Sequence, residues 1–379
     1  MKPIITSLCI EHFRSLRQLK IEGLGRVNLI TGRNNTGKSS ILEALRILAS
    51  GAASPSVLSS ILRYREEDVS EADAAGIPVD PESSNQFSSL FTGFPKLSEN
   101  REAIVLLANG GERSMRLNIS VGLFSEEEAP DGTTRLLPQK PQTTSSAMLP
   151  ETELIPALVM EDLGSKRILP MDHPVFSRRR PFRSAISDEP RLPCVFVSPY
   201  GGERTAPLGL LWDKIALSDL EKDVVEALKI LAPEIMAVSM VGGEGPQQMR
   251  TAIVRSSEFS RPVPLRSFGD GLNRLFGIIL SLVNAKGGFL LIDEFENGMH
   301  HTIEFGAWET IFRLSKFLNV QVFATSHSWD AVETFQKAAA LNPEEGVLIR
   351  LSRKGDAIIP TLFQDKELAV ATREHIEVR

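Results

Sequence analysis

One loop constrains the fold of this chain more than any other stretch. Residues 32–39 read Gly-Arg-Asn-Asn-Thr-Gly-Lys-Ser and fit the pattern G-x-x-x-x-G-K-[ST]. Residues 26–31 are typical of a short apolar strand, and residues 40–48 carry apolar side chains at helical spacing. The order of strand, glycine loop and helix is the context in which this pattern binds phosphate.

The residue types of the loop predict how a phosphate would be held. Its glycines let the backbone wrap the phosphate and turn N–H groups inward, and the helix N-terminus adds partial positive charge. Lys38 is expected to reach the β- and γ-phosphates, and the Ser39 hydroxyl to bind Mg²⁺. The loop therefore predicts a site for a nucleoside triphosphate with magnesium.

Two acidic residues predict the other side of this site. Asp293 and Glu294 directly follow the apolar residues 289–292, a continuous run that is typical of a buried parallel strand. Side chains that follow such a strand emerge at its carboxyl end, the edge at which α/β sheets bind ligands. We expect Asp293 to hold Mg²⁺ through water and Glu294 to polarise the attacking water.

Two further stretches flank the acidic pair. Ser267, Gly269 and Gly271 precede an apolar helix, and a serine with glycines at a helix N-terminus predicts a second anion-binding surface. Residues 320–324 are typical of another buried strand, which is followed by Thr325-Ser326-His327. A histidine at a strand end is often unremarkable. At the same predicted sheet edge as Asp293, however, His327 is expected to contact the γ-phosphate.

Composition limits the remaining possibilities. The net charge is −6, so nucleic acid would have to bind at a local patch. One cluster is basic: Lys166, Arg167, Arg178, Arg179, Arg180 and Arg183. It is either a solvated loop or a patch for nucleic acid or an acidic partner.

Cys9 and Cys194 are expected to be buried thiols, and with no signal-peptide pattern they favour a cytoplasmic protein. The apolar residues 275–292 contain Asn284 and Lys286, so we expect a core helix and strand and no membrane span.

The order of these motifs resembles the ABC-type P-loop ATPases of the SMC, RecF and OLD group. The resemblance is carried by "FRS" at 13–15, "GRNNTGKSS" at 32–40, "IDEFENGMHH" at 292–301 and "ATSHS" at 324–328. It implies an α/β fold with a mixed, largely parallel core sheet, an antiparallel β subdomain and a helical subdomain. The expected organisation is an ATPase lobe at 1–122, a flexible insertion with the basic run at 123–185, and a second lobe at 186–379.

The resemblance also implies residue roles. Arg14 would lie near the ribose or adenine of ATP. The phosphates and Mg²⁺ would be held by Asn34, Asn35, Thr36, Gly37, Lys38, Ser39 and Ser40. Ser267, Gly269 and Gly271 would contact the γ-phosphate bound by the other subunit of a homodimer or higher oligomer. Asp293, Glu294 and His327 would act as described above.

The sequence departs from the group at three points. The signature reads Ser-Phe-Gly-Asp-Gly in place of Leu-Ser-Gly-Gly-Gln, Phe295 stands where the group often has proline, and only Gln86 is a candidate for the Q-loop. We expect no long coiled-coil arm, which argues against an SMC protein proper, and no acidic nuclease domain after residue 330, unlike full-length OLD nucleases. We therefore expect an ATP-driven motor or switch in a DNA-linked process, such as phage defence with a separate effector nuclease. A RecF-type repair ATPase and a transporter subunit are the alternatives.

Overall fold

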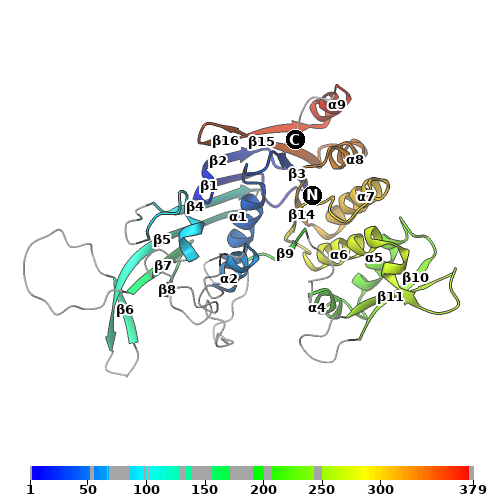
Figure 1. Ribbon diagram of the computed structural model, residues 1–379, viewed down its shortest axis with the longest axis horizontal. Coiled ribbons are helices and arrows are strands. Elements are labelled where there is room, and N and C mark those ends of the chain that lie inside the picture. The colour runs from blue at the N-terminus through cyan, green and yellow to red at the C-terminus, as the bar shows by residue number, and fades with distance from the viewer. Residues whose placement is uncertain are drawn as a thin grey trace, which may run out of the picture.

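The computed structural model has three parts. It describes residues 2–51, 55–65, 67, 86–97, 100, 102–111, 113–128, 134–138, 155–170, 191–199, 207–242 and 250–374. Figure 1 shows an antiparallel sheet on the left, a mixed sheet in the middle and a helical part on the right. This is the fold class that the sequence predicted, with a mixed core sheet, an antiparallel β subdomain and a helical subdomain.

The mixed sheet carries the predicted motifs. Its strand order is β16 (Ala357–Gln364), β15 (Gly346–Lys354), β3 (Val27–Gly32), β14 (Gln321–Thr325), β13 (Phe289–Ile292) and β9 (Cys194–Val197). All neighbouring pairs are parallel except β15 and β16. Strands β3, β13 and β14 are buried along their whole length, as their continuous apolar runs predicted. Because they are adjacent and parallel, the loops that follow them leave the sheet at one edge.

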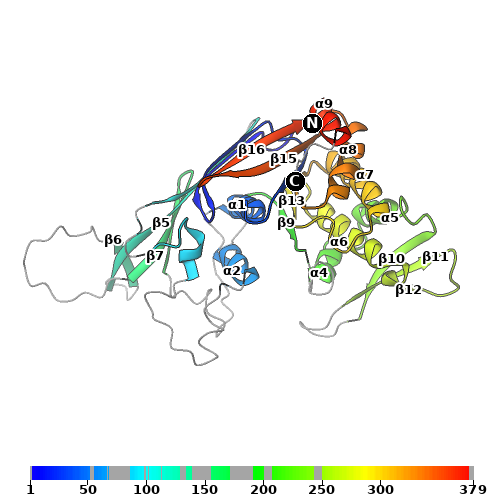
Figure 2. The ribbon, with the colours of Figure 1, turned by 45° about the horizontal axis from the view of Figure 1, so that its top comes forward.

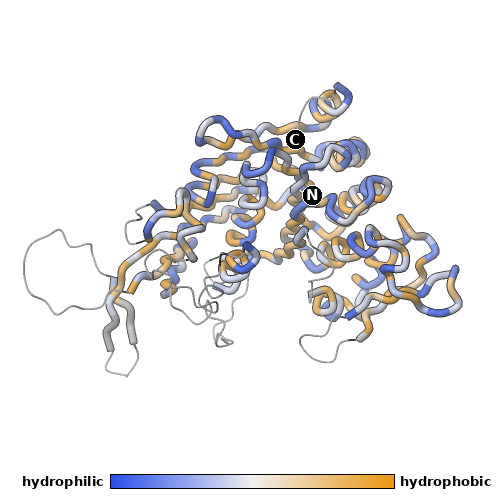
Figure 3. Tube along the Cα trace, in the orientation of Figure 1, coloured by the Kyte–Doolittle hydropathy of each residue, from blue (hydrophilic) through white to orange (hydrophobic). Residues whose placement is uncertain are grey.

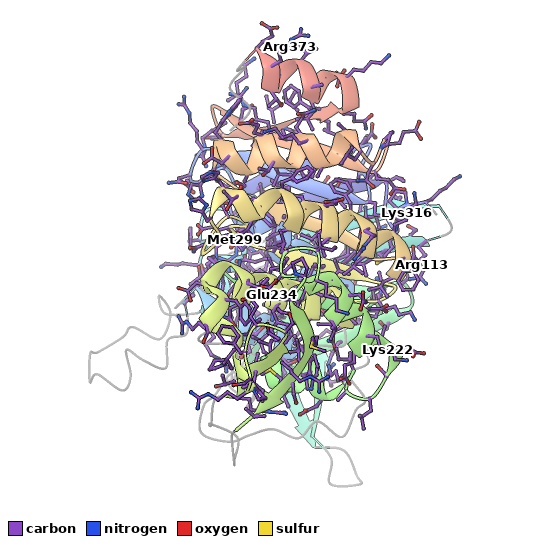
Figure 4. The ribbon with its side chains drawn as sticks, turned by 90° about the vertical axis from the view of Figure 1, so that its right-hand side faces the viewer. Arg113, Lys222, Glu234, Met299, Lys316 and Arg373 are labelled. Carbon is purple, nitrogen blue, oxygen red and sulfur yellow. The ribbon has the colours of Figure 1, made fainter. Side chains whose placement is uncertain are left out.

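The two faces of the mixed sheet pack against different layers. Leu29, Leu290 and Val322 belong to a core shared with the helices α6, α7 and α8, whereas Leu291 and Phe323 belong to a core shared with α1 and the antiparallel sheet. The helices are α1 (Lys38–Ser50), α2 (Pro55–Tyr64), α6 (Asp270–Asn284), α7 (His301–Leu318), α8 (Trp329–Ala340) and α9 (Asp365–Arg373). Figure 2 shows α1 and α2 on one side of this sheet and α6, α7 and α8 on the other. Figure 4, which looks onto the helical side, shows α9, α8 and α7 one below another.

The antiparallel sheet extends further along the chain than expected. Its order is β2 (Leu16–Glu22), β1 (Ser7–Phe13), β4 (Ile104–Gly110), β5 (Arg113–Glu128), β7 (Ile155–Asp162) and β8 (Ser165–Pro170), and β6 (Thr134–Pro138) also pairs with β5. The expected boundary between residues 122 and 123 therefore falls inside β5, and the expected flexible insertion contributes three strands to the sheet. Leu158 and Met160 on β7 are buried in the core, which explains why this segment is ordered with the first lobe.

The helical part also differs from the sequence expectation at one point. The apolar spacing of residues 212–231 is typical of a single amphipathic helix, but the structure has α4 (Pro207–Asp213) and α5 (Asp219–Leu228). Leu217 between them has a left-handed φ of 63°, and the Ser218 hydroxyl accepts a hydrogen bond from the backbone of Leu220, which starts α5. The rest is a small sheet of β10 (Ile235–Val241), β11 (Thr251–Ser256) and β12 (Val263–Pro264), joined through η4 (Leu265–Phe268) to α6.

Three other expectations concern membrane-spanning helices, the two cysteines and the basic cluster. Hydrophilic segments lie along the outer turns of α8 and α9 (Figure 3), and no helix among the described residues is long and apolar enough to cross a membrane. Cys9 and Cys194 are free thiols, and both are only partly buried, contrary to the expectation. Lys166 and Arg167 lie on β8. Arg178, Arg179, Arg180 and Arg183 lie outside the described residues, so the basic patch stays a prediction.

Candidate active site

A cavity of about 580 Å³ opens at the carboxyl edge of β3, β13 and β14. It brings together most of the residues that the sequence analysis singled out. These are Arg14, Asn34, Asn35, Thr36, Gly37, Lys38, Ser39, Ser40, Asp293, Glu294 and His327. Three expected site residues are not among those that line it, namely Ser267, Gly269 and Gly271.

The glycine loop has the backbone form that a phosphate cradle needs. Gly37 precedes α1 with a φ of 86°, and Asn35 has a φ of 63°. A Cβ atom on Gly37 would lie 2.6 Å from Cδ2 of Leu16, so a side chain at this position would need the neighbouring turn to move. Among the described residues, no side chain caps α1. The N–H groups of its first turn are therefore left for a ligand in the cavity.

Lys38 lies over the start of the same loop. Its Nζ donates to the carbonyl oxygens of Gly32 at 2.6 Å and Arg33 at 3.2 Å. Burial lowers the pKa of Lys38, and the charges of Asp293 and Glu294 oppose that shift. The ammonium group is thus held in the cavity by neutral carbonyl acceptors, and an anionic phosphate oxygen is a stronger acceptor that can replace them.

Asp293, which follows β13, connects the start of α1 after β3 with the end of β14 through its hydrogen bonds. Its Oδ1 accepts hydrogen bonds from the Ser39 hydroxyl at 3.1 Å and from the Thr325 hydroxyl at 2.6 Å. The Tyr64 hydroxyl lies 3.5 Å from the other carboxylate oxygen. A buried carboxylate with hydroxyl oxygens beside it is an oxygen donor set, which is the chemistry that Mg²⁺ prefers. Ser39 and Asp293 thus fit the metal role expected for them, and the hydroxyl of Thr325 is a contact that sequence reasoning missed.

The turn after Asp293 is held on both sides. Glu294 has a left-handed φ of 48° and its N–H donates to the Thr325 hydroxyl at 2.8 Å. The next residue, Phe295, is fully buried and stacks on Trp308 with ring centroids 3.8 Å apart. This stacking explains why a phenylalanine suits the position at which the group often has proline. The half-buried Glu294 lines the cavity beside the glycine loop.

His327 is held by an acid that the sequence analysis did not single out. Oε1 of Glu296 accepts from the backbone N–H of His327 at 2.9 Å and lies 3.1 Å from its Nδ1. The imidazole is 58% exposed. Because Glu296 lies two residues after Glu294, it ties the His327 loop to the acidic turn. The only sequence signal for this contact is the third carboxylate of Asp-Glu-Phe-Glu.

Arg14 lines the cavity, but its guanidinium already has partners. Nε lies 2.5 Å from Glu43, and Nη1 and Nη2 donate to Glu67 at 2.9 and 3.0 Å. Glu43 also pairs with Arg65. Burial raises the pKa of Glu43, and the two arginines oppose that shift. Arg14 thus anchors the β1–β2 turn to α1, and a contact between Arg14 and a nucleotide stays a prediction.

Comparisons with known proteins agree with this geometry. Residues 1–91 match the family model described as "AAA ATPase domain", and residues 168–332 match "AAA domain, putative AbiEii toxin, Type IV TA system". Over 97% of the chain and 100% of the other, the fold matches an SMC head bound to the C-winged helix domain of ScpA, with a TM-score of 0.51 and 12% identity. The fold is that of an SMC head domain, and the two AAA-type family models each match a part of the chain.

Two curated proteins are similar to this chain over different lengths. An ATP/GTP phosphatase of Helicobacter pylori is 24% identical over an alignment of 358 positions that covers 87% of each chain. The DNA replication and repair protein RecF of Actinobacillus pleuropneumoniae is 30% identical over an alignment of 142 positions that covers 32% of this chain and 39% of RecF. The first likeness spans both lobes, and the second is confined to a part of each protein.

The predicted signature stretch lies at the exposed start of α6. Ser267, Gly269 and Asp270 are exposed, and Gly269 has a φ of 105°. Gly271 is buried, and a Cβ atom there would lie 2.6 Å from Cδ1 of Ile303. No side chain of the described residues caps this helix either. Its first N–H groups are therefore left for a partner other than the cavity of the same chain.

A buried arginine connects α6 to the acidic turn. Arg274 donates from Nη1 to the carbonyl of Ser198 at 2.6 Å, and its Nη2 lies 3.5 Å from the carbonyl of Asp293. Burial lowers its pKa to about 10, and the charges of Glu296, Asp293 and Glu294 oppose that shift. Arg274 lies one helical turn after the signature glycines, but the motif pattern does not include it.

Gln86, the Q-loop candidate, begins η2 (Gln86–Leu90), and its side chain lies outside the described residues.

Proposed function

We propose that this chain binds ATP with Mg²⁺ and hydrolyses it to ADP and phosphate. One observation carries the proposal. Ser39 from the glycine loop and Thr325 from β14 both donate to Asp293, beside Glu294 in one cavity. Phosphoryl transfer depends on positioning and on neutralising charge, and these residues supply both.

Each residue has a role in that reaction. Lys38 and the N–H groups of the first turn of α1 would bind the phosphates. Ser39 and Asp293 would hold Mg²⁺, Asp293 through water. Bound Mg²⁺ supplies neutralisation of phosphate charge. Glu294 accepts the proton of the attacking water or orients it, and His327 donates to the γ-phosphate. The carboxylate of Glu296 supports this last role because it holds the imidazole at the edge of the cavity.

We further propose that ATP closes two copies of the chain head to tail. The cavity lies at the carboxyl edge of the mixed sheet, whereas the uncapped start of α6 is exposed and its residues do not line that cavity. Such a helix start suits the γ-phosphate bound by a second copy. ATP would then favour the dimer, and hydrolysis would favour its separation, because only the triphosphate contacts both copies.

The proposed setting is a DNA-linked process with a separate effector nuclease, as in phage defence. The family description that names a putative toxin supports a defence role, and the likeness to RecF supports a link to DNA. Replication or repair of the RecF kind is the second candidate, and the same likeness favours it. ATP turnover measured with and without DNA bears on both candidates.

The variant Lys38→Ala tests the enzymatic part. Removing the cation that faces the β- and γ-phosphates should abolish ATP hydrolysis and weaken nucleotide binding. Phosphate release is measured on the purified protein, with Lys222→Ala as the control because Lys222 is an exposed lysine on α5. Turnover in Lys38→Ala equal to that of the control would contradict the assignment of the loop.

A further inference from the structure

The cavity has a second wall that the proposed roles leave unexplained. It comes from the β1–β2 turn, from the loop after η2 and from the β15–β16 turn. Among the described residues that line the cavity, Phe94 is the one phenylalanine, tyrosine or tryptophan, and it is 68% exposed. Exposing a phenylalanine forgoes the free energy that burying its ring would yield. An exposed ring on the wall of a ligand cavity is a candidate contact surface.

The loop that carries Phe94 is anchored on both sides. Phe91 forms a β-bridge with Phe13, and the N–H of Thr92 donates to the carbonyl of His12 at 3.2 Å. Beyond the ring, the Ser88 hydroxyl donates to the carbonyl of Pro95 at 2.7 Å. These contacts fix the backbone on both sides of Phe94 and connect its loop to the β1–β2 turn, which carries Arg14.

The backbone at Phe94 adopts a form that most side chains avoid. Gly93 has a φ of 83° and Phe94 a φ of 53°, so two successive residues are left-handed. Glycine adopts this region without a steric cost, but a bulky residue does not. The anchors on each side are what sustain the strained backbone, and the result is that the aromatic ring stays in the cavity wall, exposed to solvent.

The cations of the same wall already have partners. Arg14 pairs with Glu43 and Glu67, and the guanidinium of Arg17 lies 3.8 Å from Asp356. Arg353 donates to the carbonyl of Asn35 at 3.1 Å. Charge for the phosphates is supplied on the other side of the cavity, by Lys38 and the helix N-terminus. This wall therefore suits an uncharged part of the ligand.

We propose that Phe94 is the platform on which the nucleobase stacks. This inference rests on the proposed nucleotide binding and adds the residue that holds the base. Stacking uses the flat face of the ring, which every base can match, so Phe94 contributes affinity without selecting between adenine and guanine. It also removes the need for Arg14 to contact the base.

Binding of diphosphates tests the proposal without the complication of hydrolysis. The affinities of ADP, GDP and pyrophosphate, each with Mg²⁺, are measured by calorimetry. Phe94→Ala should weaken ADP and GDP by about tenfold each, since stacking of a base on an aromatic ring is of this order. Pyrophosphate should bind with unchanged affinity, and Phe94→Trp should keep the affinity for ADP. Phe317→Ala is the matched control, because Phe317 is 69% exposed on α7 and does not line the cavity.

The outcomes separate this inference from the proposed function. If the parent protein binds ADP and Phe94→Ala binds it equally well, the base platform is wrong and the nucleotide site stands. If Phe94→Ala weakens pyrophosphate as much as ADP, the ring shapes the glycine loop and the platform is again wrong. If the parent protein binds neither ADP nor pyrophosphate, the proposed function fails and the inference fails with it.

Discussion

Two helices of this protein begin in nearly the same way and end up in opposite surroundings. Both α1 and α6 start after a glycine with positive φ, Gly37 at 86° and Gly269 at 105°, and no side chain of the described residues caps either one. By contrast, Ser218, His300 and Ser328 cap α5, α7 and α8. The uncapped pair thus shares a local feature that leaves N–H donors for an anion.

The surroundings of the two helix starts differ. The start of α1 lies in the cavity, where Lys38, Asp293 and Glu294 surround it. The start of α6 is exposed, and the residues beside it pair with each other, Arg266 with Asp270 at 2.8 Å. A glycine-capped helix start is therefore only half of an anion site. The other half consists of groups that the fold brings from elsewhere, and for α6 the proposed dimer would supply them.

The largest effect is expected at the complete site. Glu294→Gln should bind ATP and hydrolyse it about 10²–10⁴-fold more slowly, because the amide keeps the shape of the side chain but cannot accept a proton. Phosphate release and nucleotide binding are measured on the same preparation. Glu309→Gln is the control, since Glu309 is exposed on α7. Turnover at the parent rate would mean that another residue orients the water.

The exposed helix start is tested by its effect on assembly. In the Glu294→Gln background, light scattering should show more dimer with ATP than with ADP. Adding Ser267→Arg should remove that difference, because a long cation would occupy the space of the facing phosphate. Ser239→Arg adds the same charge to an exposed position on β10 and should keep the dimer. A mass that does not depend on the nucleotide in Glu294→Gln would contradict the dimer mechanism and leave α6 as an ordinary surface helix.

A smaller effect is expected at the contact between the two regions. Arg274→Gln removes the donors to the carbonyls of Ser198 and Asp293 and should lower the free energy of unfolding by about 1–3 kcal/mol. Urea unfolding measures this difference, with the exposed Arg255→Gln on β11 as the control. If stability and turnover both match the control, the start of α6 and the acidic turn are independent of each other.

The sequence by itself determined the elements of the site that are local. A glycine loop between a strand and a helix has one common structural context, and continuous apolar runs placed β3, β13 and β14 in the interior. Because the loops after parallel strands share an edge, Ser39, Asp293 and His327 were expected to lie together, and they line one cavity. Local patterns were weaker where a turn interrupted a helical repeat, as at Leu217, or where a segment interpreted as a charged loop forms a further strand, as in β8.

Only the tertiary structure decided which groups complete each local motif. The Thr325 hydroxyl donates to Asp293, and the carboxylate of Glu296 pairs with His327. Glu43 and Glu67 form ion pairs with Arg14. Arg274 lies close to the carbonyl of Asp293, in the turn after β13. These contacts join residues that lie far apart in the chain, and their geometry follows from packing of the layers, which no spacing rule contains. The same holds for Phe94, whose exposed ring is meaningful only because the fold places it on the wall of the cavity. Hydrophobic runs and helical periodicity are properties of neighbouring residues, so the sequence shows them directly. The chemistry of the site depends on side chains that are distant in the sequence and come into contact only in the folded protein.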